Sequence, residues 1–507
     1  MKYPYLIFLV LYCTVNSGAQ NKQDYIWFFG SDQNISEEGI QALRFDFNEL
    51  PFEPKALNNG LEFDSNNASI CDHNGKLLFY TNGCAISNAE HEIMMNGDSL
   101  NSGPFFDSFW LGDCGNGYPG RQDVLILNDP AYEKGYYLIH KTREYDPNSD
   151  PITYIKYLKY TYIDMNLDNG FGAVTQKNIP FFESRFLWSY LTGIQHINGK
   201  DWWVVQPKDS EETIFYTILL TENGFEVTDS IQLLDEPFVE NSSAAGDAKF
   251  SPDGRTYIYS NLYDDLNVFD FDRETGVLNN KRSLALKDEL KFSSVEFSPN
   301  SRFVYLSNTD TLFQVDLWEQ NLEDGKILID IYDGVPDPFA TTFFLSTLAP
   351  DCKIYIRPGS GSNIMHVINK PNEKGLACDF VERGLRLPQV SSTGGFPNFP
   401  RYRVDEAEKC DSSITTMFGE LVYYRRELTL FPNPTSDVFN IRIPDNEKGT
   451  LFFFDLHGQE VLSRRPVDRG AIIMQDVSSW PVGTYNIEFI PDDNKKRLFW
   501  SGLVQKI

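Results

Sequence analysis

Short runs in which apolar and polar residues alternate recur along most of the chain, separated by Gly, Pro, Asn or Asp. The clearest set lies between Lys249 and Gly276, where a short run leads into Ser251-Pro252-Asp253-Gly254 and two alternating runs follow. Alternation with a period of two is typical of strands that are wetted on one face, and a Pro-Asp-Gly sequence favours a tight turn. This stretch therefore predicts a unit of up to four antiparallel strands.

The same unit occurs twice more downstream. Phe297-Ser298-Pro299-Asn300 and Leu348-Ala349-Pro350-Asp351 each lead into two further alternating runs. The prolines at 252, 299 and 350 are about 47 and about 51 residues apart, a spacing that suits the four-stranded blade of a β-propeller. Because turn chemistry and strand pattern repeat together, we predict a β-propeller.

The N-terminal half contains hairpins rather than clear repeats. Asn-Gly pairs at 74–75, 82–83 and 198–199 separate alternating runs, and this is the strongest short-range hairpin pattern. Counting strand groups gives about seven blades. The last blade is expected to combine the strand near Trp27 with strands from Pro397 to Val404, a closure that removes open sheet edges.

The pattern changes after Cys410. Residues 411–427 are expected to form a linker, and residues 428–507 contain short alternating strands typical of a small β-sandwich. The predicted fold class is all-β, with a signal peptide at 1–19, a propeller at 20–410, the linker, and the C-terminal sandwich.

The first residues have the pattern of a secretory signal peptide. Lys2 precedes an apolar run, and Ser17-Gly18-Ala19 forms a small-x-small site with cleavage expected between Ala19 and Gln20. The apolar run is too short for a membrane span, and nothing later resembles one. We therefore expect an exported protein without a transmembrane span.

The composition narrows the range of partners. The formal net charge is −28, and the chain contains 39 Phe, 26 Tyr and 8 Trp residues. A chain this acidic repels phosphate backbones and anionic lipids, which argues against nucleic acid as a partner. The acidity is typical of a surface that keeps an exported protein in solution.

Six cysteines remain once the leader is removed, and an even number in an exported chain favours disulfides. Six cysteines allow fifteen pairings. The pair expected first is Cys352 with Cys378, because both fall within one repeat unit. A pairing of Cys71 with Cys84 is weaker, because Cys114 could take either one. The sixth cysteine is Cys410.

The C-terminal module resembles the sorting domain of the type IX secretion system of Bacteroidetes. The matching stretches are the Phe-Pro-Asn-Pro start, Asp455 to Val461, Gly483-Thr484-Tyr485 and the last strand; within them the motif residues are Pro432, Asn433, Pro434, Asp455, Gly458, Gly483 and Tyr485. The resemblance implies handling by the type IX secretion machinery, passage across the outer membrane, and a mature protein attached to the cell surface or released.

The region from Tyr25 to Val404 resembles a family of uncharacterised Bacteroidetes propellers that carry this sorting domain. Among the stretches that carry the resemblance are Trp27–Gly30, Leu77–Gly83 and Pro397–Pro400. This resemblance implies a fold and a destination. It implies no reaction.

Candidate chemistry is sparse. The chain has six histidines and no His-Glu-x-x-His motif, and His196, before an Asn-Gly turn, is a candidate for the channel although a structural role is expected first. Two Asp-rich stretches near 164–170 and 270–272 lack the full calcium-loop pattern. We predict no cofactor, no metal site and no catalytic residue.

Aromatic side chains are the other candidates for ligand contact. Trp188, Trp202 and Trp203 could stack on sugar rings, but consecutive strand residues in a blade face neighbouring blades, so burial is expected. Phe109 and Trp110, in an apparent loop, are the preferred candidates.

The leading hypothesis is a binding or adhesion module for a glycan or a surface protein. The alternative is a carbohydrate-active enzyme, a lyase or hydrolase, with its site at the propeller channel, and a third is a structural surface component. Titratable side chains that converge at a channel mouth would favour the enzyme, and a plugged channel would favour binding.

Overall fold

A computed structural model gives the fold in two compact units, residues 1–413 and 414–507, which are treated separately below. The structure describes residues 21–30, 42–57, 60–63, 65–109, 117–148, 152–210, 214–228, 246–261, 266–286, 293–391, 395–404, 410, 424–444, 448–455, 460–491 and 498–507. The expected signal peptide and its cleavage site at Ala19 and Gln20 lie outside these ranges.

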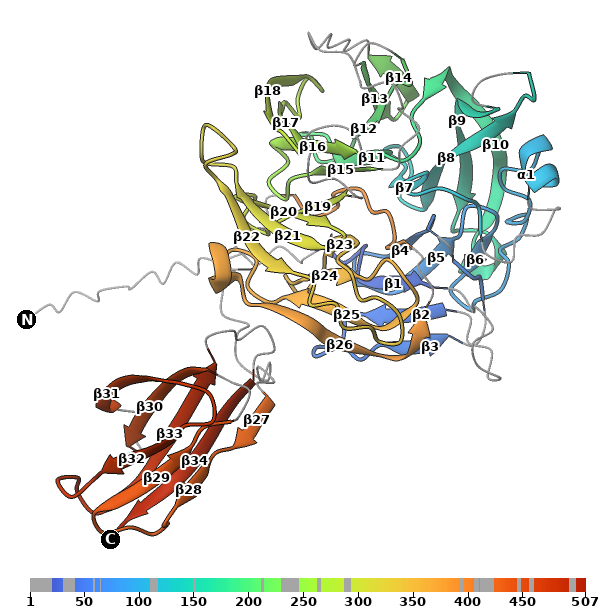
Figure 1. The fold of residues 1–507 in the computed structure, drawn as a ribbon. Coiled ribbons are helices and arrows are strands. Elements are labelled where there is room, and N and C mark those ends of the chain that lie inside the picture. The colour runs from blue at the N-terminus through green and yellow to red at the C-terminus, as the bar shows by residue number, and fades with distance from the viewer. Residues whose placement is uncertain are drawn as a thin grey trace, which may run out of the picture. The chain divides into compact units, whose positions relative to one another are not determined.

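The first unit is a β-propeller. Its described residues form seven antiparallel sheets that follow one another along the chain and around a ring (Figure 1). Five sheets have four strands, and the first two have three. The all-β prediction and the estimate of about seven blades are confirmed.

The first three blades contain strands β1 (Ile26–Phe29), β2 (Ala42–Asp46), β3 (Lys55–Leu57); β4 (Ala68–Cys71), β5 (Leu77–Thr81), β6 (Ile86–Asn88); and β7 (Val124–Asn128), β8 (Gly135–Tyr145), β9 (Thr153–Asp164), β10 (Ala173–Phe186). The next two contain β11 (Thr192–Gln195), β12 (Trp202–Pro207), β13 (Phe215–Thr221), β14 (Gly224–Thr228); and β15 (Gly246–Phe250), β16 (Thr256–Asn261), β17 (Leu266–Phe271), β18 (Leu278–Leu284). The last two contain β19 (Ser293–Phe297), β20 (Phe303–Asn308), β21 (Thr311–Asp316), β22 (Lys326–Ile331); and β23 (Leu345–Leu348), β24 (Ile354–Arg357), β25 (Ser362–Ile368), β26 (Phe380–Ser391).

Helices in this unit are short: α1 (Pro104–Phe109), η1 (Asp168–Gly170) and η2 (Gly375–Cys378). None of the helices in the described ranges is long and apolar enough to cross a membrane.

The repeated Ser-Pro turns join the first two strands of blades five and six. The Ser251 hydroxyl donates to Asp253 Oδ1 (2.5 Å) and accepts from the Thr256 amide (2.9 Å). The Ser298 hydroxyl accepts from the Phe303 amide at the same distance. The side chain therefore closes the turn, which explains why the motif recurs at the blade spacing.

The apolar core lies between neighbouring blades. Trp202 and Trp203 are consecutive on β12 and both 2% exposed. Trp202 belongs to the cluster shared with the third blade, and Trp203 to the cluster shared with the fifth. Side chains on opposite faces of a strand each fill one interface, so the expected burial of this pair is confirmed.

The expected closure of the ring is wrong in its strand composition. β1 pairs with β2 and not with residues 397–404. The last and first blades meet through apolar packing, in which Tyr355 lies beside Phe45 (ring centroids 6.3 Å apart). Pro397 and Pro400 lack the amide protons that a sheet ladder needs, and the structure places residues 395–404 along the centre of the ring instead.

The disulfide pairings expected from the sequence are also wrong. Cys352 pairs with Cys410, and Cys378 keeps a buried thiol that is not part of a disulfide. Cys84 is disulfide-bonded, but Cys71 is free and buried, so these two are not joined. Burial raises the pKa of the Cys71 thiol, which keeps it protonated.

The second unit is a sandwich of two sheets, as predicted. One sheet has the order β27-β34-β33-β30-β31 and the other β28-β29-β32. The strands are β27 (Tyr424–Glu427), β28 (Thr429–Phe431), β29 (Val438–Arg442), β30 (Gly449–Asp455), β31 (Glu460–Val467), β32 (Ile472–Asp476), β33 (Gly483–Pro491) and β34 (Leu498–Lys506). β27 lies inside the segment expected to be linker, residues 411–427, most of which lies outside the described residues.

The motif residues of this unit occupy structural positions. Asn433, between two prolines, donates to Leu503 O (2.6 Å) and accepts from the Gln505 amide (2.9 Å), which ties the Pro-Asn-Pro turn to β34. Gly483 begins β33, and Tyr485 donates to Pro481 O (2.8 Å). Asp455 ends β30, and Gly458 lies outside the described residues.

Candidate functional site

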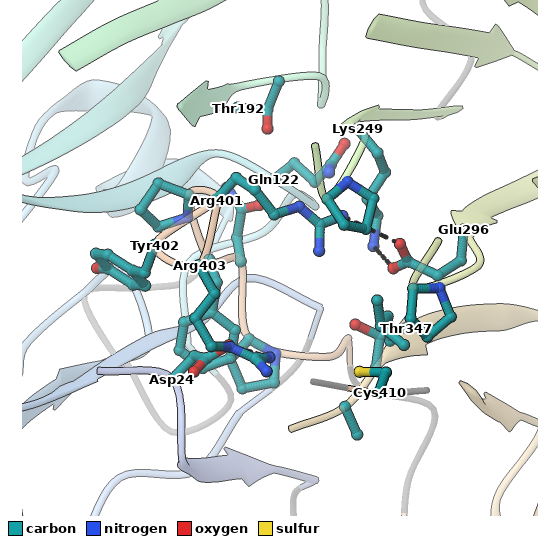
Figure 2. A pocket seen from close by; sticks show the side chains of 18 residues that line it. Asp24, Gln122, Thr192, Lys249, Glu296, Thr347, Arg401, Tyr402, Arg403 and Cys410 are labelled. Atoms are coloured by element: carbon teal, nitrogen blue, oxygen red, sulfur yellow. Dashed lines mark hydrogen bonds and ion pairs between the residues drawn. The ribbon is translucent and has the colours of Figure 1, made fainter. Parts of the chain in front are cut away.

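Residues 395–404 pass through the centre of the propeller. Figure 2 shows Arg401, Tyr402 and Arg403 of this segment beside Thr192, Lys249 and Glu296 from the first strands of three blades. Asn398 is buried, and its amide group donates to Val124 O (2.8 Å) and Leu191 O (2.9 Å) on two different blades. Its backbone amide donates to Asn67 O (2.8 Å), and Asn67 donates in turn to Gly395 O. Through Asn398 and Gly395, this short segment therefore bonds to three blades.

Arg401 and Arg403 bond to the fifth and first blades, and Tyr402 bonds to the third blade again. Arg401 donates to Phe250 O at 2.8 and 3.0 Å, and the Tyr402 hydroxyl donates to Ile126 O (2.7 Å). Arg403 pairs with Asp24 (2.8 Å), directly before β1.

The last blade contributes Arg357, whose guanidinium lies 5.9 Å from the Phe396 ring. With the contact from Arg401 to Glu296 at the start of the sixth blade (3.3 Å), this central segment, residues 395–404, reaches every blade of the ring.

A small polar cavity remains beside the central segment. Its volume is about 70 Å³, and Lys249, Glu296 and Arg401 form its charged wall (Figure 2). Glu296 accepts from Lys249 at 2.8 Å and lies 3.3 Å from Arg401. The cavity is large enough for a few ordered waters.

Glu296 is ionised in this setting. Burial alone would raise the pKa of its carboxyl, but Lys249 and Arg401 hold the pKa below its usual range. A buried carboxylate that is paired with two cations is compensated rather than poised to transfer a proton. The group therefore serves to anchor Arg401 in the channel.

A second buried charge cluster lies near the third blade. Lys141 Nζ lies 2.6 Å from Asp123 Oδ1 and donates to Ser189 O (2.5 Å) and Gln206 Oε1 (3.2 Å). Burial lowers the pKa of Lys141 to about 8, although Asp123 raises it. Every proton of this ammonium has an acceptor, which indicates a structural role.

Trp188, a sequence-based candidate for sugar stacking, lies over the guanidinium of Arg143 at 3.6 Å. Arg143 also lies 3.7 Å from Asp123. Trp188 is half-buried and belongs to this cluster, so its stacking surface is used internally.

The other predicted contact residues do not meet at the channel. His196 lies in the β11–β12 turn, where Nε2 is 3.1 Å from Glu274 O and Nδ1 is 3.1 Å from the Asn198 amide nitrogen. Phe109 ends α1, but its side chain and all of Trp110 lie outside the described residues.

The residues that fill the channel were missed by sequence reasoning. Gly395 to Val404 has no strand period, so the alternation that identified the blades carried no information here. One signal was present: two prolines and two arginines in eight residues are out of place in a sheet ladder.

Comparison with known proteins identifies the C-terminal unit. Residues 429–498 match the family described as the secretion system C-terminal sorting domain. The chain therefore carries an address for the type IX secretion system, and the protein is exported to the cell surface or secreted.

The chain also resembles other proteins at low sequence identity. WD repeat-containing protein 26 homolog of Drosophila melanogaster is 27% identical over 96 residues, which is 19% of this chain and 15% of that protein's length. A solved candidate 6-phosphogluconolactonase from Bacteroides fragilis is 13% identical, with a TM-score of 0.42, over 74% of this chain and 99% of that one. The periplasmic gluconolactonase of Pseudomonas aeruginosa is 12% identical, with a TM-score of 0.34, over 74% and 98%.

Proposed function

We propose that this protein is an exported binding module, whose propeller presents its loops to a glycan or a protein at the cell surface or outside the cell. The observation that supports binding is the filled channel. The cavity beside the central segment measures about 70 Å³, whereas pockets for small-molecule ligands measure roughly 300–1,000 Å³. A substrate ring has no room there, and contact with a large ligand falls to the outer surface.

The alternative is a carbohydrate-active enzyme with its site at the channel. The carboxylate best placed for such chemistry is Glu296, but it is ion-paired on both sides. A general acid must hold a proton near the working pH, and the lowered pKa of Glu296 opposes that role. The channel geometry thus supports the binding module over the enzyme.

Phe109 and Trp110 stay part of this proposal as contact residues. Phe109 ends α1, a helix anchored through Phe105, which packs against Tyr118 (6.0 Å between ring centroids) and lies 5.9 Å from the guanidinium of Arg143. Phe109 thus ends a helix whose base is held by packing contacts.

The test is a glycan array combined with a turnover screen on the purified, oxidised full chain. We expect retention on one class of glycan, or on a protein, with no product released. Product formation by the wild type that is lost in E296Q would overturn the binding proposal and place chemistry in the channel.

A further inference from the structure

Trp318 is an exposed aromatic residue that the sequence pattern did not single out. It lies two residues after the end of β21, and 74% of its surface is exposed. Exposure of an indole to water is unfavourable. An exposed Trp that is held in place is therefore a candidate for ligand contact.

The backbone on either side of Trp318 is held from two blades. The Leu317 amide donates to Arg302 O (2.9 Å), and the Trp318 amide donates to Asp316 Oδ1 (3.2 Å). From the neighbouring blade, Arg282 Nη1 donates to the carbonyls of Leu317 and Glu319, both at 2.9 Å. The residues flanking the indole therefore cannot move without breaking several hydrogen bonds.

The indole itself contacts a guanidinium. Arg302 makes a two-point contact with Asp316, at 3.0 and 2.7 Å, and its guanidinium carbon lies 4.2 Å from the Trp318 ring. Lys374, from the last blade, donates to the same carboxylate (3.0 Å). One face of the indole rests on a guanidinium whose own position is locked.

Two polar and accessible side chains are close to the residues that hold Trp318: Glu319 follows it in the chain, and Lys374 bonds to the same Asp316 carboxylate as Arg302. Lys374 and Glu319 lie 3.9 Å apart, and each side chain is 47% exposed. An ammonium and a carboxylate near an aromatic surface supply one strong donor group and one strong acceptor group. This combination matches a sugar ring, whose C–H face is apolar and whose edge carries hydroxyls.

We propose that Trp318 is the stacking platform of a carbohydrate-binding site, with Glu319 and Lys374 bonding to the sugar hydroxyls. This site rests on the proposed binding function and gives it a location and a ligand class. The hydrogen bonds around Trp318 explain how a single ring can provide affinity. A surface that is ordered before binding loses little entropy when the ligand binds. Protein ligands are less well matched, because hot spots for proteins are centred in desolvated apolar pockets.

The experiment uses the oxidised full chain in pull-downs on xylan, laminarin, mannan and chitin, with unglycosylated serum albumin as the protein probe. We expect wild-type retention on at least one polysaccharide, and a loss of affinity of about tenfold or more in W318A. W318F should retain part of the binding, because a smaller ring still stacks. F339A is the matched control, since Phe339 is also an exposed aromatic of the propeller (49%) and its removal should change nothing.

The double variant F109A/W110A separates this site from the proposed function. Loss of polysaccharide binding in that variant, with W318A unaffected, overturns the Trp318 site and leaves the binding function standing. Retention of albumin through Trp318 and of no polysaccharide overturns the sugar assignment. If the wild type releases product from a polysaccharide, and W318A binds and cleaves the same polysaccharide, both the Trp318 site and the binding function are overturned. Unchanged thermal unfolding of W318A is required for each reading.

Discussion

A carboxyl group on the last blade illustrates how strongly a single residue responds to its surroundings. The Glu382 side chain is 9% exposed and lies 2.8 Å from Arg383, which also contacts Asp333 at 2.6 Å. Burial raises the pKa of Glu382 to about 8; Arg383 opposes this rise, and Asp333 and Asp330 add to it. At neutral pH the folded protein therefore holds a proton on this group.

This proton makes stability depend on pH. A carboxyl whose pKa is higher in the folded state stabilises the fold at low pH, and the contribution is lost as the pH rises from about 4.5 to about 8. E382Q does not titrate, so its free energy of unfolding should exceed that of the wild type by about 1–3 kcal/mol at pH 9 and match it near pH 4. Chemical denaturation at both pH values measures the difference.

The matched control is E323Q, because Glu323 is an exposed carboxylate of the same propeller. If the difference in unfolding free energy between the wild type and E382Q stays constant across this pH range, the raised pKa of Glu382 is contradicted.

The role of a side chain could be predicted where its partners are close in the sequence. Ser251 and Ser298 close their own turns, so the motif was legible from neighbours in sequence. The partner of Cys352 lies 58 residues away, at Cys410, and no local pattern encodes that distance. Trp318 gave no signal, because the contacts that hold the residues beside it come from Arg282 and Lys374 on two other blades.

At the scale of elements, the central segment has an unusual place for a stretch without regular structure. Asn398 is buried and satisfies carbonyls on two blades at once. Truncation to alanine leaves both carbonyls without their donor inside the channel, and a buried group that loses its partner costs about 1–3 kcal/mol.

We therefore expect N398A to lower the free energy of unfolding by that amount, measured by urea denaturation of the full chain. N279A is the control, since Asn279 is exposed on β18 and its loss should be nearly neutral. Equal stabilities of the two variants would mean that the segment does not hold the blades together.

Elements were predictable in proportion to their periodicity. The alternation of β15 to β25 identified three blades and their turns, and Asn-Gly pairs located hairpins in the first half. The central segment follows no period, because its residues bond to several blades in turn and do not form one ladder. The sequence analysis assigned this segment to the last blade. The polar cavity beside it could therefore not be derived from the sequence.

At the scale of the molecule, the ring depends on how its ends are joined. The last blade meets the first through apolar packing, and among the described strands none is shared between the two sheets. The chain that leaves the channel is instead fixed to the last blade by the disulfide between Cys352 and Cys410. This bond holds the central segment in place at its C-terminal side, as the pair of Arg403 with Asp24 holds it to the first blade.

Removal of this disulfide in C352A/C410A should lower the stability of the propeller by about 2–4 kcal/mol, because the unfolded chain regains the freedom of a long loop. Alkylation mapping tests the pairing itself. Cys71 and Cys378 are buried, so iodoacetamide should label them only after unfolding without reductant, whereas Cys352 and Cys410 should require reduction as well. A non-reduced peptide that joins Cys352 to Cys378 would contradict the pairing, and the central segment would then lose its covalent link to the ring.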